Sequence, residues 1–329
     1  MVTLVSVCPN WREQSFKLAV VAMFALAGCS GLGPASVSNS SARQQLLQPW
    51  IDLTGSRSIS QFGQPGLAVS GGYIVLRQPT AISARANDLY FIDAGLHRIF
   101  RYNRVEQTLT PFSNLAAEAV MSIYTAPDMS VYITDPVRAQ VLHFSPNGSP
   151  LPSLVSPGNL GRPIAIAIDE SSGQLLVADA LYNQIIVFNY QGQALSIIKP
   201  QQVRGIAAMA LGTDGIYILD KLARQIVVMR FDGTYRYAFG ADALTAPAAI
   251  TVSRDNLVFV SDHSDQTIKV FRNGQLLSTA GGTGIAPGRF NQIAGMAVEG
   301  GLFYAADSLN ARVQIMFINT HALDTRKGE

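Results

Sequence analysis

The sequence predicts an all-β fold made of one unit repeated six times, and three observations carry this prediction. First, six apolar runs each end in an aspartate: Asp93, Asp135, Asp179, Asp220, Asp262 and Asp307. Second, successive aspartates lie 41 to 45 residues apart. Third, nothing within the units shows helical periodicity. A fixed period of this length with several short strands per unit is typical of a β-propeller, so we expect a six-bladed β-propeller of four-stranded blades.

The third unit illustrates the strands expected in each blade. Its apolar runs at residues 163–168, 175–178, 184–188 and 194–198 are separated by turn-forming sequences. Four short runs joined by tight turns predict four antiparallel strands. Large apolar side chains recur six and nine residues after each aspartate, where we expect them to fill the space between neighbouring blades.

The ring needs a closing strand, because the sixth unit ends near residue 318 without a clear fourth strand. We expect an N-terminal segment, either residues 58–62 or residues 73–76, to supply the outer strand of the last blade. Closure of this kind removes the long unpaired edge that an open array would leave. The propeller is therefore predicted over residues 57–319, followed by a polar tail at 320–329.

The N-terminal sequence predicts an export signal. Arg12 and Lys17 precede an apolar stretch, residues 18–27, that is too short to span a membrane. It ends in Leu26-Ala27-Gly28-Cys29, which resembles the lipobox of bacterial lipoproteins. The resemblance implies a signal peptide over residues 1–28 and lipid, including palmitate, on Cys29. An ordinary export signal with a chance cysteine is the alternative.

A lipid anchor would place the protein in the bacterial cell envelope, attached to a membrane. Removal of residues 1–28 takes away Cys8 and leaves one cysteine, which is accounted for if it carries lipid. Because Ser30 rather than aspartate follows the cysteine, we expect the periplasmic leaflet of the outer membrane if the organism is Gram-negative. Residues 29–56 are rich in small and polar residues and predict a flexible tether, of which Leu46, Leu47 and Trp50 rest against the domain.

Two segments resemble a known repeat family. The sequence AGGTGIAPGRFNQIAGMAVEG at residues 280–300 is similar to the linker and first strand of NHL repeats, and DAGLHRI at residues 93–99 is similar to the following loop and strand. The resemblance covers residues 57–318 and is strongest in units one, three and six. NHL domains are commonly six-bladed propellers, in agreement with the six units counted here.

Composition limits the class of partner. Hydrophobic residues make up 48% of the chain and charged residues 14%, which supplies a large core. The formal net charge is +2, and no stretch gathers enough Lys and Arg to neutralise a phosphate backbone. We therefore expect no nucleic acid partner.

The six aspartates could be mistaken for a ring of metal ligands. A residue at the same place in every repeat more simply does one local job six times. An aspartate at a strand end accepts hydrogen bonds from the backbone of the following turn, and we predict this role for all six. The glycines of residues 281–284 lack the helix and lysine that a phosphate-binding loop needs, so they predict a turn.

Function is expected where the repeats differ, on the turns that follow the aspartates. Six residues on these turns are the candidate ligand-binding positions: His97, Arg138, Tyr182, Lys221, His263 and Asn310. Their mixture of apolar, aromatic and cationic groups favours an envelope protein, a peptide or a glycan as ligand. We therefore expect a binding or scaffold module without catalysis of its own and without a cofactor.

The alternative is an enzyme. Six-bladed propellers related to the NHL family include metal-dependent lactonases and lyases, so the resemblance also admits this chemistry. The site would use His97 and His263 in the channel with one Ca²⁺ or Zn²⁺ ion, and Asp265, Asn183 and Asn310 could add oxygen ligands.

Overall fold

The computed structural model describes residues 45–57, 73–113 and 121–320. The described residues all belong to one compact unit. The predicted signal peptide, Cys29 and the predicted tail after residue 320 lie outside the described residues. No helix among the described residues is long and apolar enough to cross a membrane.

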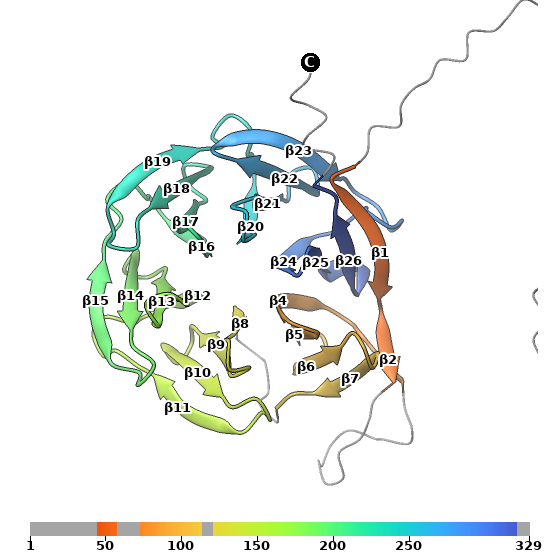
Figure 1. The fold of residues 1–329 in the computed structure, drawn as a ribbon, viewed down its shortest axis with the longest axis horizontal. Coiled ribbons are helices and arrows are strands. Elements are labelled where there is room, and N and C mark those ends of the chain that lie inside the picture. The colour runs from red at the N-terminus through yellow and green to blue at the C-terminus, as the bar shows by residue number, and fades with distance from the viewer. Residues whose placement is uncertain (1–44, 58–72, 114–120, 321–329) are drawn as a thin grey trace, which may run out of the picture. The chain divides into compact units, whose positions relative to one another are not determined.

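The described residues form a ring of six sheets around a central channel (Figure 1). Blade 1 contains β4 (Pro79–Arg85), β5 (Asp88–Asp93), β6 (Arg98–Asn103) and β7 (Thr108–Pro111). Blade 2 contains β8 (Ile123–Thr125), β9 (Val131–Asp135), β10 (Gln140–Phe144) and β11 (Pro150–Leu154). Blade 3 contains β12 (Pro163–Asp169), β13 (Gln174–Asp179), β14 (Gln184–Phe188) and β15 (Ala194–Ile198).

The second half of the ring repeats this plan. Blade 4 contains β16 (Ile206–Gly212), β17 (Gly215–Asp220), β18 (Gln225–Met229) and β19 (Tyr235–Phe239). Blade 5 contains β20 (Pro247–Val252), β21 (Val258–Asp262), β22 (Thr267–Arg272) and β23 (Gln275–Gly281). Blade 6 contains β24 (Ile293–Glu299), β25 (Leu302–Asp307), β26 (Arg312–Ile318) and β1 (Leu47–Leu53), with a short 3₁₀ helix η1 (Ser308–Asn310). The predicted six-bladed, all-β fold is confirmed.

The core lies between the blades. Middle strands such as β5, β13 and β17 are buried along almost their whole length, because each sheet is packed between two neighbours. The outer strand β15 exposes four of its five residues. Phe259 of blade 5 and Phe303 of blade 6 pack with ring centroids 5.1 Å apart, which shows how matched positions fill the space between adjacent sheets.

An N-terminal strand closes the ring, as predicted, but this strand is neither of the two segments that the sequence analysis named. β1 pairs antiparallel with β26, with Leu47 opposite Ile318 and Leu53 opposite Val313. Of the two segments named above, residues 58–62 lie outside the described residues. The other forms β3 (Tyr73–Val75), which pairs with β2 (Gly55–Arg57) and extends the sheet of blade 1 to six strands.

The closing strand lies inside the stretch assigned to the tether, so the structured domain begins before residue 57. The sequence does not predict β1, because this outer strand buries only its two ends, Leu47 and Leu53, and shows no alternating apolar pattern. The expected contacts of Leu46, Leu47 and Trp50 with the domain are confirmed. Leu46 and Leu47 are buried, and the Trp50 ring lies 4.7 Å from that of Phe317.

Arg312 fastens the closing strand to blade 6. Its side chain is 6% exposed, and its Nη1 lies 2.8 Å from the carboxylate of Asp52 in β1. Its Nε lies 2.8 Å from Asp307, the aspartate of the same blade. A single buried guanidinium thus joins both ends of the propeller.

Candidate functional site

Each aspartate organises the turn between the second and third strands of its blade. Asp93 accepts hydrogen bonds from the N–H of Leu96 in this turn, at 3.0 Å, and from the N–H groups of Arg77 and Gln78, at 2.8 and 3.0 Å. Arg77 and Gln78 precede the innermost strand β4, so the carboxylate joins the turn to the incoming linker. The aspartates of the other blades accept equivalent turn or linker bonds: Asp135, Asp179, Asp220, Asp262 and Asp307. The predicted bonds from the backbone of the following turn are confirmed for five of the six aspartates. Asp307 instead accepts the linker N–H of Asn291 and bonds from the side chains of Asn310, Arg312 and Gln314.

The six turns share one backbone conformation. The fourth residue after each aspartate has φ between 51° and 57°, in the left-handed region: His97, Ala139, Asn183, Arg224, Gln266 and Ala311. Asn183 and His97 are the residue types in this set that adopt this region most readily, and the hydrogen-bonded turn holds Ala, Arg and Gln there in the other blades. We call the end of the propeller that carries these turns and the linkers the Asp-turn face.

Three consecutive blades present large apolar side chains on this face. Val137, Leu181 and Leu222 stand two residues after their aspartates and are 74%, 61% and 70% exposed. Tyr182, next to Leu181, is 48% exposed. These four residues are called the apolar arc. They stand at matching or adjacent positions of neighbouring blades on one face, and exposed apolar side chains that share a surface are candidates for an interaction site.

Cationic side chains flank the apolar arc. Arg138 is 70% exposed and lies 3.0 Å from Asp135, and Lys221 is exposed. Three exposed arginines also enter from the linkers: Arg77, Arg162 and Arg204. The backbone N–H of each is held by the aspartate of its own blade. Within the described residues their guanidinium groups form no hydrogen bond or ion pair.

The six residues singled out from the sequence all lie on the Asp-turn face, but they divide into two groups. His97, Arg138, Tyr182 and Lys221 are exposed. By contrast, His263 donates from Nε2 to the carbonyl oxygen of Ile293 at 2.9 Å, which joins blade 5 to blade 6. The side-chain amide of Asn310 donates to Gly284 and to Asp307. The first group presents its polar atoms to solvent, where they can meet a ligand, although Nη1 of Arg138 is paired with Asp135.

The extra oxygen ligands considered for a metal ion are engaged in the fold. Asn183 donates to the carbonyl of Val203 at 2.8 Å and accepts from the N–H of Ile206 at 3.0 Å. Asp265 accepts from Thr267 and Lys269. Over the described residues, no group of three or more His, Cys, Asp or Glu side chains is placed to hold a metal ion.

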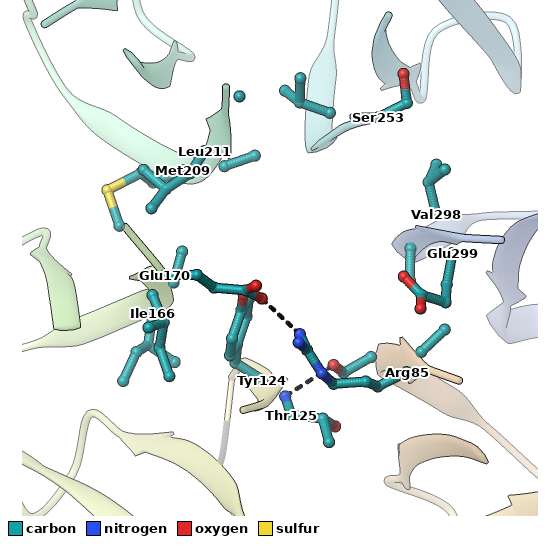
Figure 2. Close-up of a pocket in the computed structure, with 18 of the residues that line it drawn as sticks. Arg85, Tyr124, Thr125, Ile166, Glu170, Met209, Leu211, Ser253, Val298 and Glu299 are labelled. Atoms are coloured by element: carbon teal, nitrogen blue, oxygen red, sulfur yellow. Dashed lines mark hydrogen bonds and ion pairs between the residues drawn. The ribbon is translucent and has the colours of Figure 1, made fainter. Parts of the chain in front are cut away.

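A cavity of about 560 Å³ lies in the channel at the opposite end from the Asp-turn face. The register shows this, because Asp93 is opposite Pro79 at the start of β4, whereas the cavity is lined by the end of β4, from Ile82 to Arg85. Its polar wall includes Arg85, Tyr124, Glu170 and Glu299 (Figure 2). None of the six sequence candidates borders it.

Charge and burial shape the cavity wall. Nη1 of Arg85 in blade 1 lies 2.7 Å from Oε1 of Glu170 in blade 3, so the ion pair spans the intervening blade. Burial lowers the pKa of Arg85, but the bonded Glu170 carboxylate outweighs it and the pKa is raised. Burial, with a smaller contribution from Glu170, raises the pKa of Tyr124 to about 12, so its hydroxyl stays protonated at neutral pH.

Part of the chain is similar in sequence to a lyase. No family model matches the chain, so the NHL resemblance stays a prediction. A virginiamycin B lyase of Nocardia farcinica (strain IFM 10152) is 26% identical over 182 residues, which are 55% of this chain and 61% of that protein. The match thus spans less than two thirds of the relative.

Solved structures share the fold at low identity. A streptogramin B lyase matches with a TM-score of 0.58 and 13% identity, covering 77% of this chain and 96% of that one. A virginiamycin B lyase from Staphylococcus aureus matches with a TM-score of 0.56 and 13% identity, over 74% and 95% of the two chains. A Bacteroides thetaiotaomicron protein of unknown function reaches 0.63 at 15% identity, over 82% and 75%. The chain is a six-bladed β-propeller with virginiamycin B lyase-like neighbours.

Proposed function

We propose that the propeller is a binding module of the bacterial cell envelope and that the Asp-turn face recognises a protein or peptide. The observation that carries the proposal is the apolar arc, which exposes four large side chains on consecutive blades beside unpaired arginines. Burial of such side chains against a partner gives affinity, and the surrounding charges select which partner binds.

The chemistry of this face favours an acidic protein or peptide over a glycan. Val137, Leu181 and Leu222 are aliphatic and have no groups to match the hydroxyls of a sugar. Tyr182 is the one aromatic side chain of the arc. Arg77, Arg162 and Arg204 would pair with carboxylates on the partner.

Replacement of three arc residues by serine, Val137→Ser with Leu181→Ser and Leu222→Ser, should reduce partner affinity by about tenfold or more. The fold should persist, because these side chains are exposed. The measurement is recovery of crosslinked partner with the affinity-purified protein, normalised to the wild type.

The matched control carries three serines on other exposed positions, Val155, Leu195 and Leu276. It should retain the partner. Equal loss in both triple variants, or retention in the arc variant, would contradict the assignment of the binding surface to the Asp-turn face.

The proposed envelope location rests on the lipobox-like sequence before Cys29. Two or three acyl chains hold a protein stably at a membrane, whereas one holds it only marginally. A Cys29→Ser variant of the full chain should leave the detergent phase on phase separation. Unchanged partitioning of that variant would refute the anchor.

A lyase is the second candidate, and the relative from Nocardia farcinica favours it. A structure of the Staphylococcus aureus lyase in complex with quinupristin contains a catalytically inactive variant in which alanine replaces one histidine. In this chain the candidate histidines are His97, which is exposed, and His263, whose Nε2 is held by Ile293.

Incubation with quinupristin, with and without added divalent cations, separates the two candidates. Elimination adds no water, so lyase products together keep the mass of the substrate, whereas hydrolysis adds one water. The binding proposal predicts unchanged quinupristin by mass spectrometry. Conversion by the wild type that is lost in the His97→Ala, His263→Ala double variant would establish the lyase instead.

A further inference from the structure

The channel cavity is lined by the innermost strands of all six blades, and its inner wall is apolar. Six large aliphatic side chains occupy equivalent positions, one from each blade, and every one is buried: Ile82, Ile123, Ile166, Met209, Ile250 and Met296. We call this set the aliphatic ring. The ring borders the cavity on the side nearer the Asp-turn face, because the polar residues follow later along the same strands.

The outer wall of the cavity is polar and carries excess negative charge. Its charged side chains are Arg85, Arg254, Asp169, Glu170 and Glu299. The carboxylate of Asp169 is occupied by the hydroxyls of Ser171 and Ser172. Figure 2 shows the guanidinium of Arg85 between Glu170 and Glu299, with its ion pair directed to Glu170.

Two polar groups of this wall have unused bonding capacity. Glu299 is half-buried, accepts the N–H of Ala86 at 3.2 Å and forms no ion pair within the described residues. Thr125 is 2% exposed and borders the cavity, yet its hydroxyl has no hydrogen-bond partner in the described structure. The Thr125 oxygen is covered by protein atoms, so its missing hydrogen bond is a free-energy cost of the fold, whereas the Glu299 carboxylate keeps capacity for a ligand.

We propose that this cavity binds an amphipathic small molecule with an ammonium head group. Its apolar body would pack on the aliphatic ring, and its head group would lie beside the Glu299 carboxylate, which forms no ion pair within the described residues. The volume of about 560 Å³ falls in the range of small-molecule sites. This site is separate from the Asp-turn face, so it does not depend on the proposed protein partner.

An anionic head group fits the same wall less well. At Arg85 it would have to displace Glu170 and would then lie near both carboxylates, with like charges brought together in a partly desolvated space. The other cationic side chain of the wall, Arg254, is exposed, so an ion pair there would contribute little. A cation can pair with Glu299, which forms no salt bridge within the described residues and acts on Arg85 only at longer range. The charge arrangement therefore selects ammonium over carboxylate ligands.

Three probes with the same eight-carbon tail test the proposal: octylammonium, octanol and octanoate. Calorimetric titration of the purified full-length protein should give saturable binding of octylammonium, about tenfold or more tighter than octanol. Octanoate should bind more weakly than octanol. Glu299→Gln should weaken octylammonium about tenfold and leave octanol unchanged.

Glu106→Gln provides the matched control, because Glu106 is exposed on blade 1 and does not border the cavity. It should leave all three affinities unchanged, and thermal unfolding of both variants should match the wild type. Tightest binding of octanoate, equal binding of the three probes, or no saturable binding would each overturn the proposal. So would an equal effect of the two glutamine variants.

Discussion

Deletion of the closing strand β1 should leave a protein that no longer unfolds cooperatively and that aggregates. The deletion exposes the edge of β26, removes the buried side chains of Leu47 and Leu53, and separates Arg312 from Asp52. Each lost leucine costs about 1.5–3 kcal/mol in burial alone, and whole domains are stable by only about 5–15 kcal/mol. An unpaired edge strand also templates association between molecules.

Circular dichroism during urea unfolding, with sedimentation to detect aggregates, measures this effect. The control is deletion of residues 1–44, which leaves β1 in place. This control should unfold at the same urea midpoint as the full-length protein. A chain without residues 45–53 that stays monomeric and unfolds at the control midpoint would show that β1 does not close the ring.

Asp262→Asn should destabilise the propeller by about 3 kcal/mol, because one substitution weakens a cluster of charge-assisted hydrogen bonds. The buried carboxylate accepts the N–H groups of Thr245, Ala246 and Ser264 at 2.7 to 3.0 Å. It also lies 3.2 Å from Nζ of Lys269. Asparagine keeps the shape but presents an amide NH₂ where one of the acceptors stood.

Equilibrium unfolding in urea at pH 7 measures the loss. Asp242→Asn is the control, because Asp242 is an exposed linker residue of the same blade. Its unfolding midpoint should stay at the wild-type value. Indistinguishable midpoints for the two variants would contradict the role assigned to the six aspartates.

The same carboxylate makes stability depend on pH. Burial raises the pKa of Asp262, but hydrogen bonds from Ser264 and from the N–H groups of Thr245 and Ala246 outweigh burial, and the net pKa is lowered. A lowered folded-state pKa means that the stabilisation is fully present above the unfolded-state pKa, about 3.9, and is lost as the pH falls below it. The stability difference between wild type and Asp262→Asn should therefore shrink on acidification below about pH 4.

The fold was predictable because each blade repeats the same four-stranded unit with an aspartate at the end of its second strand. The aspartates mark the strand ends, and apolar residues on both faces of the middle strands mark sheets packed between neighbours. The closing strand was misplaced because β1 is mostly exposed and carries no periodic signal. Only the burial of Leu46 and Leu47 connects it with the core.

The candidate surface was predictable in part. The aspartates located the turns, and four of the six residues chosen there are exposed. No sequence pattern indicates that His263 and Asn310 are bonded between segments. Arg77, Arg162 and Arg204 were missed, although each stands 16 or 17 residues before the aspartate that holds its backbone. The channel cavity was missed because it joins Arg85 to Glu170, 85 residues later in the chain.

Site-specific photocrosslinking in intact cells tests the proposed function most directly. A photoreactive residue at position 222, in the apolar arc, should give one dominant adduct that protease digests and glycosidases leave intact. The same residue at position 276, on the outer strand β23, should give none. Adducts at position 276 alone, at neither position, or a position 222 adduct that resists protease would contradict a protein-binding Asp-turn face.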